Sequence, residues 1–184
     1  MGEAFYGFVG VLVGSVISIL GPWISEWRNN KRKAKYSAAR LVCQLDEYAV
    51  NCSRVASMRA PPAGQPFDMN VPLPKIYSDD IEWSLLESKF AFESLSLPNV
   101  ARQSAMSIDC EINTHQPRYY REIIEKIQEN SFKIGYLAIG LSKDLRKFYD
   151  LPEEDTFPSQ MEEFFNQMLD AIKKNREKRE ANEG

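Results

Sequence analysis

The chain has 184 residues, of which 43% are hydrophobic and 27% are charged, an ordinary balance for a folded protein. That length suffices for one domain of roughly 150 residues and a short additional segment. Residues 1–40 hold six basic and two acidic side chains, a net charge of +4, whereas the remainder holds 17 basic and 24 acidic ones, a net charge of −7. An acidic body argues against a large nucleic-acid interface, which requires a basic domain.

Residues 5–24 contain no Asp, Glu, Lys or Arg. A helix of that length reaches about 30 Å, the thickness of a bilayer's hydrocarbon core. Basic residues follow it directly, namely Arg28, Lys31, Arg32, Lys33 and Lys35. This order predicts a transmembrane anchor within residues 1–27 of a single-pass protein, with the C-terminal domain on the cytoplasmic side of the inner or plasma membrane. The basic residues are expected to bind lipid headgroups. A cleaved signal peptide and a buried core helix stay open as alternatives.

Small side chains collect on one face of this predicted helix, namely those of Gly7, Gly10, Gly14, Ser18 and Gly21. Small residues let membrane helices approach closely, so this face predicts a homo-oligomer. The alternative is an anchor that stands alone, since glycine is common in membrane helices. If several anchors enclosed a pore, its polar lining would come from Ser15, Ser18, Ser25 and Glu26. The aromatic rings of Tyr6, Trp23 and Trp27 are expected to anchor the two membrane interfaces.

The remaining chain predicts an all-α, antiparallel bundle of four to five helices, because apolar residues recur at helical spacing and no segment alternates like a strand. The anchor is expected to continue into the bundle without a flexible linker. Residues 28–58 form the basic collar and first bundle helix, and 59–77 form a Pro-rich crossover loop, packed along the bundle or serving as a partner-binding strap. Residues 78–172 complete the bundle, and 173–184 are a charged, fraying tail.

Capping and breaking residues set the expected helix bounds. Ser78 is expected to cap a second helix that ends at Leu97, and a short third helix is expected over 98–112. Pro117 fits the first turn of a fourth helix, and Ser159 begins the capping box of a fifth. Gly135 and Gly140 inside the fourth helix indicate close contact or a bend. Its stripe repeats every seven residues at Tyr120, Ile127, Ile134, Leu141 and Phe148.

No group of residues predicts catalysis. Cys43, Cys52 and Cys110 are interpreted as reduced thiols, and a metal site is not expected because there is no close Cys pair and only one histidine, His115. That histidine has no placed Ser, Cys or Asp partner, so it is a weak candidate for a general base. No Gly-rich phosphate loop is present, and no cofactor is expected.

The sequence therefore predicts a non-enzymatic, membrane-anchored scaffold or regulatory protein that binds lipid, itself and a protein partner through its cytosolic helices, with nucleic acid not expected as a partner. The alternative is an oligomeric, pore-forming or membrane-permeabilising effector. This order of a short anchor before a helical cytosolic domain is similar to small accessory membrane proteins of some bacterial antiviral defence systems. The similarity concerns architecture only and involves no shared motif. An enzyme with a divergent helical active site is a third reading.

Overall fold

A computed structural model of the chain describes all residues except 1, 59–69, 76, 115–119, 153–156 and 184. Its α-helices are α1 (Gly2–Ala56), α2 (Ser88–Thr114), α3 (Tyr120–Tyr149) and α4 (Phe157–Glu183), and a short 3-10 helix, η1, spans Trp83–Leu85. The described residues contain no strand. The prediction of an all-α helical bundle is thereby confirmed.

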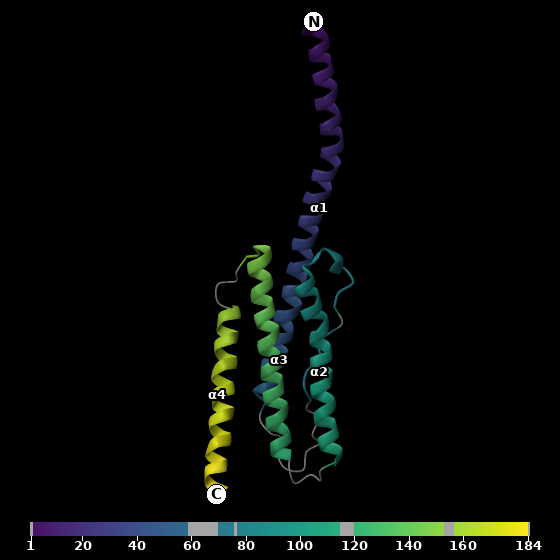
Figure 1. Cartoon of the computed structure of the whole chain (residues 1–184). Helices are drawn as coiled ribbons and strands as arrows, with labels where there is room; N and C mark the ends of the chain where they lie inside the picture. The colour runs from purple at the N-terminus through teal and green to yellow at the C-terminus, as the bar shows by residue number, and fades with distance from the viewer. Residues whose placement is uncertain (1, 59–69, 76, 115–119, 153–156, 184) are drawn as a thin grey trace.

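α3 lies in the middle of the bundle and packs against α1, α2 and α4 (Figure 1). It runs antiparallel to these three helices, whereas α1 and α2 run in the same direction. The expectation of a purely antiparallel bundle is therefore wrong for this pair. Two parallel neighbours require a connection that returns the chain along the bundle, and residues 57–58, 70–75 and 77–87 are the described part of that connection.

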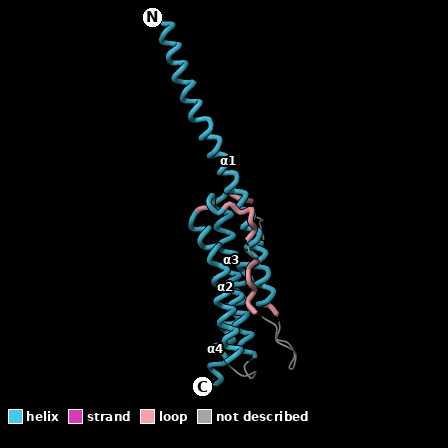
Figure 2. The backbone as a smooth tube through the Cα atoms, turned by 90° about the vertical axis from the view of Figure 1, so that its right-hand side faces the viewer, coloured by secondary structure: helices cyan, strands magenta, loops and turns pink. Residues whose placement is uncertain are grey.

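The part of this connection that we call the strap, residues 70–75 and 77–86, lies along both α1 and α2 (Figure 2). On the α2 side, the Asn70 amide donates to Asp109 at 3.0 Å and the Tyr77 hydroxyl donates to the Ser94 carbonyl at 2.6 Å. On the α1 side, the Tyr48 hydroxyl donates to the Pro72 carbonyl at 2.8 Å. These contacts show that the described part of the Pro-rich crossover packs along the bundle.

The second helix does not begin at Ser78, because acidic residues that follow Ser78 pair with α1. Asp80 pairs with Arg40 of α1 at 3.0 Å, and Glu82 pairs with Lys33 at 3.1 Å. The Glu82 backbone N–H also donates to the buried Ser37 hydroxyl at 3.0 Å. These tertiary contacts keep the chain non-helical up to η1, and α2 begins only at Ser88.

The second and third predicted helices are one helix, with Pro98 inside α2. Proline lacks an N–H, so the carbonyl four residues earlier, that of Ser94, loses its helical hydrogen bond. The Tyr77 hydroxyl donates a hydrogen bond to that carbonyl at 2.6 Å, and the side chain of Ser94 is fully buried. A strap residue thus replaces the donor that Pro98 removes, and the helix continues.

In the last two helices, the predicted apolar stripes match the buried residues better than the predicted helix starts match the observed ones. In α3, Ile127, Ile134 and Leu141 are buried, whereas Phe148 is 58% exposed. α3 is described from Tyr120, and Pro117 lies outside the described residues. α4 begins at Phe157, so Ser159 lies within the helix rather than capping it, since proline at position 158 suits the first turn. The charged tail is helical up to Glu183.

Candidate functional site on the projecting N-terminal helix

The N-terminal part of α1 extends beyond the other helices and packs against no other described element (Figure 1). Every residue in 20–33 is exposed, and Ala34 is the first described side chain of α1 that is buried. Four of the exposed side chains are large and apolar, namely Leu20, Trp23, Ile24 and Trp27. Both tryptophans are more than half exposed, at 68% and 60%. A contiguous apolar surface of this kind marks a site of contact with a partner or a membrane.

Among the side chains that the structure describes, no helix has a stretch both long and apolar enough to cross a membrane. The side chains of residues 1–13, 16, 17 and 19 are outside that set, and they make up most of the predicted anchor. Three predicted site residues, Tyr6, Gly7 and Gly10, lie there. The transmembrane anchor therefore stays a prediction.

The small-residue face of the predicted anchor is described at Gly14, Ser18 and Gly21, and all three residues are exposed. A Cβ atom at Gly14 or Gly21 would meet no described atom within 4 Å. Glycine inside a helix costs about 1 kcal/mol relative to alanine, and packing within this fold does not require it at either position. The residues predicted to line a pore, Ser15, Ser18, Ser25 and Glu26, are also exposed along this projecting segment.

The predicted lipid-binding collar divides into two parts. Arg28, Lys31 and Arg32 lie on the projecting segment, where the Lys31 ammonium sits 5.7 Å from the centre of the Trp27 ring. Lys33 and Lys35 instead contact the top of the bundle, where Lys33 pairs with Glu82 of the strap. Lys35 pairs at 3.7 Å with the carboxylate of Asp150, the residue after α3. Both ammonium groups are therefore already paired within the fold.

Acidic residues of the strap make the upper edge of the bundle complementary to the collar. A hydrogen bond from Ser78 and the nearby charge of Arg40 hold the pKa of the Asp80 carboxyl below its ordinary value of 3.8. Asp80 is therefore ionised at neutral pH, and its pair with Arg40 joins the strap to α1. Exposed ion pairs contribute little to stability individually. The three pairs made by Lys33, Lys35 and Arg40 therefore mainly orient the strap and the end of α3 against α1.

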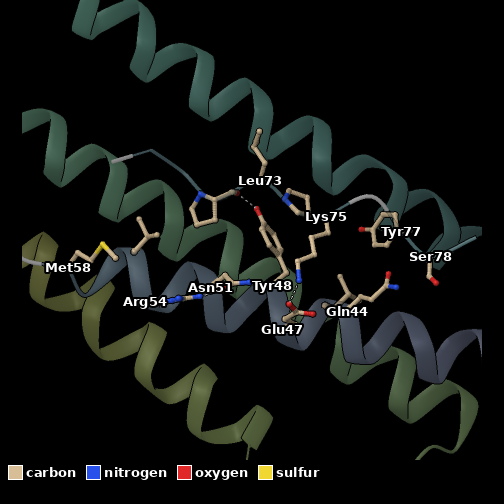
Figure 3. A pocket seen from close by; sticks show the side chains of 14 residues that line it. Gln44, Glu47, Tyr48, Asn51, Arg54, Met58, Leu73, Lys75, Tyr77 and Ser78 are labelled. Atoms are coloured by element: carbon tan, nitrogen blue, oxygen red, sulfur yellow. Dashed lines mark hydrogen bonds and ion pairs between the residues drawn. The ribbon is translucent and has the colours of Figure 1, made fainter. Parts of the chain in front are cut away.

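A groove of about 560 Å³ lies between α1 and the strap (Figure 3). Tyr48 and Lys75 reach across it, the first to the Pro72 carbonyl and the second to the Glu47 carboxylate at 2.5 Å. Its remaining lining mixes apolar and polar side chains, including Met58, Leu73 and Gln44. Sequence reasoning missed this groove, since it exists only because a non-helical segment lies against α1.

A buried ion pair joins α1 to α3. The Arg146 guanidinium donates to the Asp46 carboxylate at 2.6 Å, and the Ser142 hydroxyl donates to the same carboxylate at 2.6 Å. The side chains of Arg146 and Asp46 are only 8% and 15% exposed. The apolar stripe carried no signal for this pair, because Arg146 directly follows Leu145 and so projects about 100° away from it around the helix.

Burial suppresses the reactivity of the described ionisable groups in the core. It raises the pKa of the Cys52 thiol to about 12 and the pKa of the Tyr77 phenol to about 12. Cys43 and Cys110 are exposed, and neither forms a disulfide. Within the described part of the chain, no three His, Cys, Asp or Glu residues are grouped to hold a metal ion. His115 lies outside the described residues.

Comparisons with protein-family models, with curated proteins and with solved structures find no match to this chain. The projecting segment of α1 and its basic collar are the features that bear most directly on function. They unite exposed tryptophans, a small-residue face and positive charge on one continuous helix.

Proposed function

We propose that this protein is a single-pass, membrane-anchored scaffold or regulatory module, without catalytic activity, that acts through protein contacts. The observation that supports this most strongly is the exposed apolar surface of residues 20–27, on a helix that leaves the bundle. The uncharged run of residues 5–24 overlaps this surface, and the collar follows it. A bilayer covers such a surface and gives the collar anionic headgroups to bind.

The collar supports a rigid connection between membrane and body. α1 is one helix from Gly2 to Ala56, so no flexible linker separates the anchor from the bundle. Lys33 and Lys35 contact the strap and the end of α3, on either side of α1. In this proposal, a tilt or rotation of the anchor changes the orientation of the entire bundle, which makes the body suitable for displaying binding surfaces close to the membrane.

Extraction of membranes with alkaline carbonate tests the anchor in the full-length protein. The wild type should stay in the membrane pellet. The double substitution Leu12→Arg and Val16→Arg should release it, because arginine at the centre of a span costs about 2.5–3.5 kcal/mol. A wild-type protein that carbonate releases completely would contradict the proposal.

A matched control places the same two charges on the bundle. Gln103→Arg and Gln160→Arg lie at exposed positions of α2 and α4, and this protein should remain in the pellet. All three proteins should keep the same melting temperature of the bundle, since the first two substitutions lie in the N-terminal part of α1, which projects from it, and the control substitutions lie at exposed positions. Dye release from vesicles carrying the wild type would instead favour the pore-forming effector.

A further inference from the structure

One side of α1 remains uncovered where the helix runs through the bundle. The strap covers one flank of α1 through its contacts with Arg40 and Glu47. α3 and the residue after it cover the other flank through Lys35 and Asp46. Between the flanks lies an uncharged surface, which we call the α1 strip, made of Tyr36, Ala39, Cys43 and Val50. Tyr36 is 58% exposed, Val50 is 40% exposed and Cys43 is exposed.

The α1 strip lies on the same side of the helix as the small-residue face of the anchor. At about 100° per residue, Gly14, Ser18 and Gly21 fall within an arc of about 60° around the helix axis. The four residues of the α1 strip fall within the same arc of about 60°. Since α1 continues through Pro22 without interruption, the two surfaces form one line along the helix.

We propose that a second copy of this chain packs in parallel along this line, from the anchor down to Val50. The inference rests on the proposed function, because insertion into one membrane makes two copies point the same way. Continuity with the small-residue face specifies the occupant, since two anchors that meet through Gly14 and Gly21 bring their α1 strips to the same axis. A two-fold interface of this kind uses the same patch on both copies.

The charges beside the α1 strip favour a second copy over an anionic partner. The charges that flank Tyr36 to Val50 are paired within their own subunit, so two copies meet there without strong repulsion, and Arg54, one turn beyond the strip, bonds Asn51. The pairs are Arg40 with Asp80, Lys75 with Glu47, Lys35 with Asp150 and Arg146 with Asp46. Arg32 falls in the same arc above the strip, within the collar, where lipid phosphates neutralise it. A nucleic acid or a lipid surface would find no unpaired positive charge along the strip itself.

Cys43 provides a direct test, because residues that face each other across a parallel helix pair approach the Cα separation of about 4.4–6.8 Å that a disulfide requires. Isolated membranes carrying full-length Cys110→Ser, which keeps Cys43, are oxidised with copper-phenanthroline and oxygen. Two thiols then form one S–S bond, losing two protons and two electrons to the oxidant. A non-reducing gel should show most of this protein as a dimer.

The matched control is Cys43→Ser, which keeps Cys110, an exposed cysteine on α2. It should remain a monomer under the same oxidation. Equal dimer yields from the two variants, or a monomer from Cys110→Ser, would overturn the proposal. Single cysteines at Tyr36→Cys, Val50→Cys and Gln44→Cys, each with Cys43→Ser and Cys110→Ser, extend the test. The first two should cross-link, and Gln44→Cys should not, because Gln44 lines the strap groove.

The carbonate extraction separates the two possible failures. A protein that stays in the membrane but does not cross-link through the α1 strip refutes this arrangement and leaves the anchor intact. A protein that carbonate releases refutes the anchor, and with it the reason for a parallel pair. Gly14→Leu should reduce the Cys43 dimer at least tenfold while the protein stays in the pellet, since a large side chain separates the two anchors.

Discussion

Gly135 of α3 lies close to side chains of both α1 and α4, and alanine at this position is a sharp test of the packing. A Cβ atom there would lie 2.5 Å from Phe165 Cζ and 2.9 Å from Cys52 Cβ. Phe165 is fully buried against Phe132, with ring centres 5.8 Å apart, so it cannot swing away freely. Cys52 Cβ is bonded to the backbone of α1, so relief requires the helices to separate. Overpacking of this kind costs about 1–3 kcal/mol.

Helix propensity opposes this cost, since alanine is favoured over glycine by about 1 kcal/mol. The two contacts involve a buried ring and a main-chain-linked atom, which places the overpacking cost at the upper end of its range. We therefore expect Gly135→Ala to lower the free energy of unfolding by about 2 kcal/mol. For a chain of this size the melting temperature should fall by about 4–8 °C. Thermal unfolding followed by circular dichroism measures it.

Gly140 provides the matched control on the same helix. A Cβ atom there would meet no described atom within 4 Å. Gly140→Ala should therefore gain the propensity term alone, about 1 kcal/mol, and raise the melting temperature by about 2–4 °C. If both substitutions stabilised the protein equally, the tight packing of Phe165 and Cys52 against Gly135 would be refuted.

Three further predictions concern buried polar groups. Tyr77→Phe should lower the free energy of unfolding by about 1–2 kcal/mol. The loss should be clearly smaller in a Pro98→Ala background, because the restored N–H of residue 98 donates to the same carbonyl. Urea unfolding of the wild type, the two single variants and the double variant measures this double-mutant cycle. Asp46→Ala should cost about 3 kcal/mol by leaving Arg146 buried without its partner, and adding Arg146→Met should recover most of the loss in the same assay. Cys52 holds its proton to a pKa of about 12 when folded, against an ordinary 9.0. The stability that the protonated thiol contributes is complete below pH 9 and is lost as the pH rises toward 12. Above about pH 9 the melting temperature of Cys52→Ala should therefore fall less steeply with pH than that of the wild type.

Several features of the fold were predictable because they depend on local pattern. Apolar residues at helical spacing located the helices, and the stripe through Ile127 and Ile134 identified the buried side of α3. The penalty for glycine inside a helix predicted close contact or a bend at Gly135, and the structure has a close contact there. The same reasoning drew attention to Gly140, where no close contact exists. Glycine in a sequence does not reveal whether a neighbour requires it.

Tertiary contacts decided the features that local pattern predicted incorrectly. Ser78 and the acids after it have the composition of a helix start, yet partners on α1 hold them in the strap. Pro98 by itself predicts a helix end, yet the helix continues because the Tyr77 hydroxyl of the strap donates to the Ser94 carbonyl, which lacks its helical donor.

By itself, the sequence determined that the chain is helical, which sides of its helices are apolar, and where positive charge follows an uncharged run. Only the tertiary structure decided that α1 and α2 are parallel, that Asp46 meets Arg146, and which side of α1 stays uncovered. The physical reason is one of range. Helical periodicity arises from residues three or four positions apart, whereas these features depend on groups that are brought together from distant parts of the chain.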